Sequence, residues 1–399
     1  MKNLENSNIK DVLSGFADLN SIVDFISVLN KLRTLQYGDN AHEIRVNSFY
    51  YYSNPKVSKD KYHQFSIPKK SGGERIIHAP KKGLKSIQRT ISDLLNLVYT
   101  PNDCVNGFVP KRSIIDNAKP HVAKNYVYNI DLKDFFPSID MRRVKACLKL
   151  SPFNLNDETA FLIANICCEK LVVSRRVEGV LKDVERLVLP QGAPTSPIIT
   201  NIVSQRLDRR LIGIAKRFGL TYSRYADDIT FSSDYNVYQN NSEFIIELNK
   251  IIGVENFQIN ESKTRLQKSG YKQEVTGLIV NEKVNVKSTY IKDLRMKIYL
   301  WETYGFDRAD KLFQKDYSID KMISSPNMIN VINGKLLFLS MVKGVDSPVF
   351  LKLKHRFEKL IIIKGNKDIS KVNLGNVLDV MMNKGIGEGL ELFNKYKNQ

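Results

Sequence analysis

Two adjacent carboxylates, Asp227 and Asp228, stand between short apolar stretches at residues 220–222 and 229–231. The segment Tyr225-Ala226-Asp227-Asp228 between these stretches has the length of a tight hairpin turn, on which both carboxylates can point at one ion. Two like charges buried together are costly unless a cation lies beside them. The segment therefore indicates a metal site, although four residues alone also fit an ordinary Asp-Asp turn.

A third carboxylate, Asp131, interrupts a stretch over residues 126–132 that otherwise predicts a buried strand. With Asp227 and Asp228 it supplies the oxygen ligands that Mg²⁺ prefers. Two Mg²⁺ ions about 4 Å apart can bind the attacking and leaving oxygens of an in-line phosphoryl transfer. Surface aspartates are the alternative interpretation, and two separate motifs in this order make it the weaker one.

A stiff loop over residues 189–197 adds a third element with Gln191, Gly192, Pro194 and Pro197. Glycine lets a backbone approach a ligand closely, and proline restricts the loop. Gln191 can hydrogen-bond a nucleotide or a template base. Taken alone, this segment would be a Pro-rich connector.

The composition is that of a globular protein of 399 residues with a formal net charge of +19. Such a basic balance favours a polyanionic partner, because Lys and Arg displace counterions from phosphates. An anionic membrane surface or simple solubility would also account for the charge. We expect no membrane span and no signal peptide, and so a cytoplasmic protein, because no long apolar run appears. The four cysteines form no CxxC pair and are expected to be small buried hydrophobes.

Hydrophobic periodicity predicts an α+β fold. The element order β-α-β-β-α-β, with long insertions, is that of a ferredoxin-like sheet. Ser196 is expected to cap the helix that begins near Pro197. The predicted elements are a mostly helical region over 1–60, a hairpin over 64–80, a helix over 84–98, a strand over 126–132, a helical region to 171, a strand end at 187, a helix from 197 to 218, a hairpin over 221–233, a helix over 241–252, a strand over 275–286 and helices from 288 onward.

The first helix after residue 288 has two distinct faces. Ile291, Leu294, Ile298 and Trp301 share one face, and Lys292, Arg295 and Tyr299 share another. The polar face is either solvated or lies against a nucleic-acid backbone. Beside a site for phosphoryl transfer the second interpretation is preferred. The stretch over 364–399 is interpreted as an extension that binds a partner or product, or completes the helical region.

The ordered set of motifs resembles motifs A, B and C of reverse transcriptases. These are the segments Asp131-Leu-Lys-Asp-Phe-Phe136, Pro190-Gln-Gly-Ala-Pro-Thr-Ser-Pro197 and Tyr225-Ala-Asp-Asp228. The resemblance covers about residues 60–290 and implies a right-hand polymerase, with fingers and a ferredoxin-like palm followed by a helical thumb. It divides the chain into an N-terminal helical region (1–60), fingers and palm (61–286), thumb (287–363) and a C-terminal extension (364–399).

Two further segments are similar to elements of bacterial retron reverse transcriptases. Asn117-Ala-Lys-Pro-His121 resembles their NAxxH element, and Val275-Thr276-Gly277 resembles their VTG element. The resemblance implies that the VTG region recognises a cognate structured RNA. Contacts with RNA are therefore expected from seven residues: Asn117, His121, Val275, Thr276, Gly277, Lys292 and Arg295. His121 would otherwise be an ordinary core or surface histidine.

The resemblance also implies roles for single residues. Asp131 and Asp227 would be the principal ligands of two Mg²⁺ ions, with Asp228 in support. Phe136 falls at the position that excludes ribonucleotides, and strand alternation predicts that Phe135 and Phe136 face opposite ways. Lys263 would protonate the leaving pyrophosphate. The dNTP would be held by Lys69, Lys70 and Arg75 at its triphosphate and by Gln191 and Gly192 near the base.

The reaction implied is RNA-templated transfer of nucleotides from dNTPs. The retron resemblance implies synthesis primed by the 2′-hydroxyl of a guanosine in the same noncoding RNA, which gives branched RNA–DNA. It also implies a role in antiphage defence with a separate effector protein. The alternatives are a non-retron defence reverse transcriptase and a catalytically silent RNA-binding protein on the same fold. A group II intron maturase and a viral RNA polymerase are less favoured, the latter because of Phe136.

Overall fold

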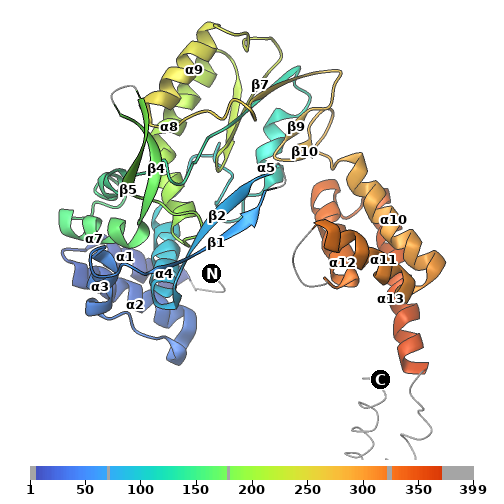
Figure 1. The fold of residues 1–399 in the computed structure, drawn as a ribbon, viewed down its shortest axis with the longest axis horizontal. Helices are drawn as coiled ribbons and strands as arrows, with labels where there is room; N and C mark the ends of the chain where they lie inside the picture. The colour runs from blue at the N-terminus through green and yellow to red at the C-terminus, as the bar shows by residue number, and fades with distance from the viewer. Residues whose placement is uncertain (1–5, 70–71, 178–179, 321–325, 371–399) are drawn as a thin grey trace, which may run out of the picture. The chain divides into compact units, whose positions relative to one another are not determined.

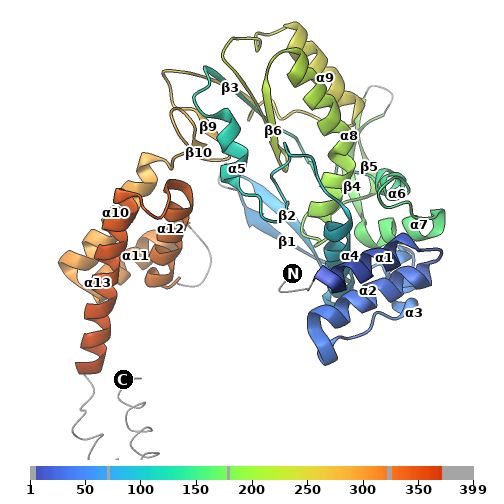
Figure 2. The ribbon, with the colours of Figure 1, turned by 180° about the vertical axis from the view of Figure 1, so that it is seen from behind.

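The computed structural model describes residues 6–69, 72–177, 180–320 and 326–370. The chain forms two compact units, which are described separately (Figures 1 and 2). Unit 1 is Met1–Thr276 with Val280–Glu282, and unit 2 is Gly277–Ile279 with Lys283–Gln399. The finer division at residues 60, 286 and 363 stays a prediction.

Unit 1 begins with a helical layer, as the periodicity predicts. Ser21 caps the second helix by a reciprocal pair of hydrogen bonds with Asp24, the two residues of a capping box. Phe25 packs edge-on against Phe49 in the core of this layer. The elements are α1 (Asn6–Ala17), α2 (Ile22–Tyr37), η1 (Gly38–Asn40) and α3 (Val46–Ser53).

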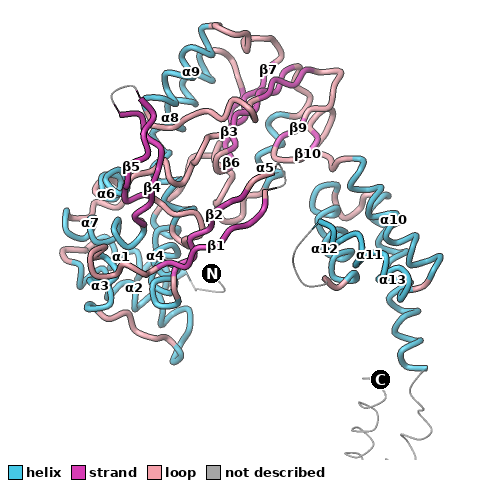
Figure 3. Tube along the Cα trace, in the orientation of Figure 1, coloured by secondary structure: helices cyan, strands magenta, loops and turns pink. Residues whose placement is uncertain are grey.

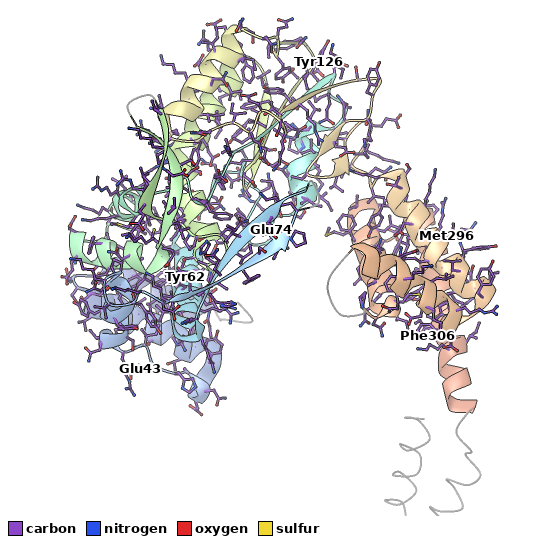
Figure 4. The ribbon with its side chains drawn as sticks, in the orientation of Figure 1. Glu43, Tyr62, Glu74, Tyr126, Met296 and Phe306 are labelled. Carbon is purple, nitrogen blue, oxygen red and sulfur yellow. The ribbon has the colours of Figure 1, made fainter. Side chains whose placement is uncertain are left out.

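The predicted hairpin over 64–80 is present as β1 (Tyr62–Pro68) and β2 (Glu74–Pro80). Tyr62 pairs with Pro80 at its base, and Glu74 pairs with Pro68 toward its tip (Figure 4). Most of its residues are exposed, so the hairpin reaches out from the core. It leads into α4 (Lys82–Val98), which buries an apolar stripe, and then into α5 (Ile114–Ala118) and η2 (Lys119–His121).

A four-stranded antiparallel sheet, called here the palm sheet, lies at the centre of unit 1 (Figure 3). Its strand order, β6-β7-β3-β8, is the ferredoxin-like order, which confirms the predicted fold class. The strands are β3 (Tyr126–Asp131), β6 (Thr221–Tyr225), β7 (Asp228–Ser233) and β8 (Arg265–Lys268).

The last strand of the palm sheet differs from the prediction. It is β8, whereas the sequence favoured residues 275–286. The strand β8 carries no apolar run and is held by its pairing with β3, so only the partner strand specifies it. Within 275–286 the extended segments are β9 (Glu274–Val275) and β10 (Leu278–Ile279), each of two residues.

The two faces of the palm sheet differ in chemistry because strand residues alternate between them. Ile130, Tyr222 and Phe231 belong to the apolar core that includes α8 (Ser196–Arg217) and α9 (Glu243–Val254). The opposite face is polar although it is buried, with Asn129, Ser223, Thr230 and Ser232 at most 4% exposed.

The predicted helical region up to residue 171 ends earlier. It contains α6 (Met141–Leu148) and α7 (Asp157–Cys167), and a separate hairpin of β4 (Glu169–Val177) and β5 (Val180–Val188) follows (Figure 3). Valines recur along both strands, and β-branched residues favour extended backbone. That signal was present in the sequence and points to the hairpin.

Ser196 does not cap α8. The residue before the helix is Thr195, which makes no capping hydrogen bond, and Ser196 is the first helical residue. Its hydroxyl donates to the Pro190 carbonyl at 2.7 Å and so closes the loop that carries Gln191. Pro197 lies in the first turn, as predicted.

From Ser288 onward, the described part of unit 2 is helical. Leu294, Ile298 and Trp301 of α10 are buried, and Lys292 and Arg295 are exposed, so the predicted faces are confirmed. Trp301 packs edge-on against Phe306, and Figure 4 marks Phe306 and Met296. The helices are α10 (Ser288–Tyr304), α11 (Phe306–Asp320), α12 (Met328–Lys343) and α13 (Pro348–Ser370). Most of the predicted extension, residues 371–399, lies outside the described residues.

The structure bears on the predicted burial of the cysteines and on the expected absence of a membrane-spanning helix. Cys167 and Cys168 are fully buried free thiols, and Cys104 and Cys147 are half-buried. Burial raises the pKa of Cys167 to about 12, so this thiol stays protonated. Among the described residues, no helix has the length and apolar character needed to cross a membrane.

Candidate active site

The three carboxylates meet at one end of the palm sheet. Asp131 is the last residue of β3 and lies opposite Asp228, the first residue of β7, in the strand register. Asp227 lies in the two-residue turn between β6 and β7, and its carbonyl accepts a hydrogen bond from the Leu132 amide at 3.0 Å. Asp131, Asp227 and Asp228 are called here the carboxylate cluster.

Burial and mutual repulsion act on this cluster. Desolvation, followed by the charges of Asp227 and Asp131, raises the pKa of Asp228 to about 7. The pKa of Asp227 is also raised, first by desolvation and also by Asp131, while Lys263 and Arg75 oppose the rise. The cluster therefore holds more negative charge than its own surroundings stabilise, which is what a cation site requires.

Asp131 already has two partners from the segment that follows α9. Lys263 Nζ contacts its two carboxylate oxygens at 3.1 and 3.0 Å, and Asn260 Nδ2 donates to Oδ1 at 3.0 Å. As the side chains stand, no three His, Cys, Asp or Glu residues of the described chain are arranged to hold a metal ion. The donor set still fits Mg²⁺, since carboxylate oxygens are its ligands and Lys263 is an exposed side chain that can leave Asp131.

A cavity of about 1250 Å³ lies between the β1–β2 hairpin, β4 and the turn after β3. Its lining includes Lys69, Arg75 and Gln191, three residues that the sequence assigned to the nucleotide. Lys133 and Asp134 also line it, from the turn that follows Asp131. Tertiary structure thus brings together side chains from three separate motifs. Lys70 lies outside the described residues.

Gly192 packs closely against β2, and its predicted approach to a ligand stays a prediction. Its φ is +124°, and a Cβ there would lie 2.8 Å from the carbonyl oxygen of His78 and 2.8 Å from the Ile77 side chain. The His78 amide also donates to the Gln191 carbonyl at 2.8 Å. The glycine therefore lets this loop dock against β2, and the docking places Gln191 on the cavity wall.

Phe135 and Phe136 follow the end of β3 and lie in a turn, so the strand-alternation argument for them is wrong. Asp134 before them has a φ of +46°, which bends the backbone. Phe135 is buried, and Phe136 is half-buried with its ring 6.0 Å from that of Phe108. Phe136 thus keeps accessible surface close to the carboxylate cluster in sequence, and its role as a gate stays a prediction.

The NAxxH element is structural in this fold. His121 has no exposed surface, and its Nδ1 and Nε2 lie 2.7 Å from the hydroxyls of Ser232 and Ser223. Burial lowers the pKa of His121 to about 3, so the ring is neutral. Asn117 is equally buried and its Oδ1 accepts from Asn106. Neither side chain has surface for an RNA contact, which corrects the expectation for both.

The residues of the VTG element differ in their exposure to solvent. Val275 is fully buried and cannot contact RNA directly. Thr276 and Gly277 have φ values of +47° and +83°, the pair typical of a type I′ turn, and Gly277 is exposed. Lys292 and Arg295 are exposed on α10. RNA contacts by these last four residues stay a prediction.

Two groups at the site were missed by sequence reasoning. Asp134 and Lys133 line the cavity, and Asn260 holds Asp131. Asp134 stood within the quoted motif and Asn260 three residues before Lys263, so their positions were visible but not their contacts. Arg224, the residue before the Tyr225–Asp228 turn, is fully buried, and nothing in its local sequence distinguishes it from a solvated arginine.

Comparison with known proteins identifies a family to which the part of the chain around the carboxylate cluster is similar. Residues 67–285 match the family model described as reverse transcriptase (RNA-dependent DNA polymerase). This range contains the carboxylate cluster, most of the β1–β2 hairpin and the VTG turn, and it is more than half of the chain.

Three curated relatives are retron reverse transcriptases. The chain is 41% identical over 229 residues to the retron Mx65 reverse transcriptase of Myxococcus xanthus, covering 57% of this chain and 53% of that protein. The retron Mx162 enzyme of the same organism is 38% identical over 232 residues, with 55% and 47% covered. The retron Ec86 enzyme of Escherichia coli is 32% identical over 247 residues, with 60% and 69% covered. The chain spans about half the length of the two Myxococcus relatives. It belongs to the reverse transcriptase family and, within it, to the retron-type enzymes.

Proposed function

We propose that this protein is an RNA-directed DNA polymerase that copies part of a structured noncoding RNA into single-stranded DNA. The observation that carries the proposal is the meeting of Asp131, Asp227 and Asp228 at one end of the palm sheet. Arg75 from the β1–β2 hairpin is close enough to lower the pKa of Asp227 against the effect of burial. A polyanionic substrate that reaches from the cavity toward the carboxylate cluster would thus meet cations of the hairpin and then the carboxylates.

The cavity suits a dNTP. Lys69 and Arg75 are the cations that would bind the triphosphate, and charge-assisted hydrogen bonds to phosphate are strong. Gln191, held on the cavity wall by the docked loop, would contact the base. Phe136 lies in the turn after β3, between Asp134 and Pro137, which line the cavity. It would lie under the sugar and exclude a 2′-hydroxyl by steric clash.

The carboxylate cluster would hold two Mg²⁺ ions, which supply charge stabilisation for the attacking and leaving oxygens of the transfer. Before metal and nucleotide bind, Lys263 neutralises Asp131. Release of this ammonium group would free the Asp131 oxygens and make Nζ available as the acid for the leaving pyrophosphate. The same lysine would thereby link the binding of metal and nucleotide to protonation of the leaving pyrophosphate.

The partner is proposed to be a cognate structured RNA. The net charge of +19 favours a polyanion, and the exposed Lys292 and Arg295 on α10 and the VTG turn are the candidate contacts. In line with the retron-type relatives, the 2′-hydroxyl of a guanosine in that RNA would prime synthesis. The branched RNA–DNA product would serve antiphage defence together with a separate effector protein.

Coexpression of the chain with its adjacent genomic noncoding region tests this proposal. The expected product is single-stranded DNA that stays linked to RNA until a debranching enzyme is added. An Asp227→Asn, Asp228→Asn variant is the control and should give no DNA. Linear DNA without a 2′ branch would keep the polymerase assignment and remove the retron mechanism.

A primed generic RNA template with dNTPs and Mg²⁺ tests the polymerase activity apart from the cognate RNA. Extension by the parent and none by the double variant would support catalysis by the carboxylate cluster. No extension by a folded parent on either template would contradict the proposal and favour an RNA-binding protein on this fold.

A further inference from the structure

The turn that carries Asp227 has a backbone conformation that its residues do not favour. Tyr225 and Asp228 pair across it, and Ala226 between them has a φ of +58°. A residue with a Cβ is uncommon in this left-handed region, and such strain persists only where surrounding contacts hold it. Some part of the fold must therefore hold Ala226.

Arg224 supplies one such contact from beneath the turn. Its side chain is completely buried, and Nη1 donates to the Ala226 carbonyl at 3.1 Å. Nε and Nη2 each donate to one carboxylate oxygen of Asp208 on α8, both at 2.7 Å. The guanidinium is thus fixed by a bidentate ion pair, and its Nη1 reaches the turn.

A second contact to Ala226 comes from Gly107, in the segment before α5. A Cβ on Gly107 would lie 2.3 Å from the Ala226 amide nitrogen, so the two backbones are packed against each other. Asn201 of α8 connects both supports, since its Nδ2 donates to the Gly107 carbonyl at 2.9 Å and its Oδ1 accepts from Arg224 at 3.2 Å. Ala226 is held at its carbonyl and at its amide by one network.

The network contains an ion pair with almost no solvent access on either side. Buried ion pairs often stabilise a fold no better than apolar residues of equal volume, because both charges must be desolvated. What this pair supplies is geometry: the planar guanidinium binds both oxygens of Asp208 and also the Ala226 carbonyl, a fixed arrangement that the single nitrogen of lysine does not reproduce. Arg224 lies one residue before the strained turn that carries Asp227 and Asp228. This position indicates that the guanidinium fixes the conformation of that turn.

We infer that Arg224, anchored by Asp208, is a positioning residue that sets the Tyr225–Asp228 turn and thereby the metal affinity of Asp227 and Asp228. The inference rests on the proposed function of the carboxylate cluster. It adds that the affinity of the cluster depends on a fully buried pair that touches neither metal nor substrate.

The test variant is the full chain with Arg224→Met and Asp208→Asn together. Both charges are removed, so neither is left buried alone, and the hydrogen bonds from the guanidinium to Ala226 and Asn201 are lost. The matched control is Tyr222→Phe, which removes the 2.7 Å hydrogen bond to Asp208 and leaves Arg224 on the turn. Thermal unfolding and circular dichroism establish that each variant is folded.

Mn²⁺ alone is the probe, and its binding is followed by electron paramagnetic resonance without nucleotide. We expect the affinity of the double variant to fall by about fivefold or more and that of Tyr222→Phe to stay within about twofold of the parent. On a primed RNA template, kcat should fall about tenfold or more in the double variant while KM for dNTP changes little. Arg224→Lys should resemble the double variant in both measurements.

A folded double variant with the Mn²⁺ affinity of the parent would overturn the inference and leave Arg224 as a stabilising residue only. An equal loss of affinity in Tyr222→Phe would also overturn it, because the effect would then belong to the whole network. If the parent binds Mn²⁺ but makes no DNA, the proposed function fails, and the difference in Mn²⁺ affinity between the variants still decides the role of Arg224.

Discussion

Asp131 and Asp228 lie directly opposite each other on β3 and β7, at the end of the sheet where the turn of Asp227 closes. Strand pairing alone brings these two carboxylates together, although 96 residues separate them in sequence (228 − 131 − 1). Lys263 forms its ion pair with Asp131. Burial and the charges of Asp227 and Asp131 raise the pKa of Asp228 to about 7, although Arg265 and Lys263 oppose the rise.

Replacing Asp228 by Asn should therefore abolish DNA synthesis and at the same time stabilise the metal-free protein. Removal of this buried charge relieves desolvation and repulsion, which outweigh the opposing effect of Arg265 and Lys263. In EDTA near neutral pH, the melting temperature should rise by about 2–4 °C for each kcal/mol relieved. Differential scanning calorimetry measures it, and Asp234→Asn on the surface is the control. A lower melting temperature would contradict this account of the cluster.

Arg75→Ala should raise KM for dNTP by about tenfold or more, because a charge-assisted contact to the triphosphate is lost. Arg89→Ala, which removes an equal charge from an exposed position on α4, is the matched control and should change KM little. Steady-state kinetics on a primed RNA template give both values. Equal changes in the two variants would mean that Arg75 acts through general charge and not at the cavity.

Gly107→Ala should lower activity sharply. The added Cβ would meet backbone atoms of Ala226 and Tyr225 at 2.3 and 2.8 Å, so the turn or its neighbour must move. Gly213→Ala on α8 meets nothing within 4 Å and should retain activity and stability, since alanine favours the helix over glycine. Primer extension and thermal unfolding of both variants test this, and full activity of Gly107→Ala would refute the tight packing.

Phe136→Ala should increase the use of ribonucleotides relative to deoxyribonucleotides. The half-buried ring packs on Phe108 in the turn after β3, and its removal opens space where a sugar 2′-hydroxyl would lie. The ratio of kcat/KM for rNTP and dNTP should shift by about tenfold or more toward rNTP. Phe135→Leu, a change in the core beside it, should leave the ratio unchanged. A constant ratio in Phe136→Ala would place the gate elsewhere.

Stability should fall on acidification in a way that depends on His121. Burial lowers its pKa to about 3 in the folded protein, whereas the unfolded chain binds a proton near pH 6.5. The unfolded state therefore gains stability as pH falls below about 6.5, and between about pH 7.5 and 5.5 this costs the folded state about 1 kcal/mol.

The His121→Gln variant lacks this titration and should lose about 1 kcal/mol less over the same interval. Gln can still bond one of the two serine hydroxyls, Ser232 or Ser223, which limits the damage to the fold. Urea unfolding of the parent and the variant at both pH values measures the difference. Parallel losses in the two proteins would show that another group controls the response.

Much of the architecture followed from the sequence alone. Alternating apolar residues predicted the strands on either side of the Ser-Gly-Gly and Ala-Asp turns. The 3.6-residue period separated the buried face of α10 from Lys292 and Arg295. The order of three motifs identified the carboxylates and the fold class. The hairpins, the helix faces and each single motif are local features, because side chains a few residues apart encode them.

Only the tertiary structure decided which of these residues meet and which are hidden. The strand β8 exists because β3 pairs with it, and Gly192 serves the docking of its loop on β2. His121 and Arg224 are buried because partners distant in sequence satisfy their hydrogen bonds. A polar side chain carries no local sign of such burial, since desolvation is offset by groups that only folding brings near. The sequence therefore determined the chemistry of this site, and long-range packing determined its geometry.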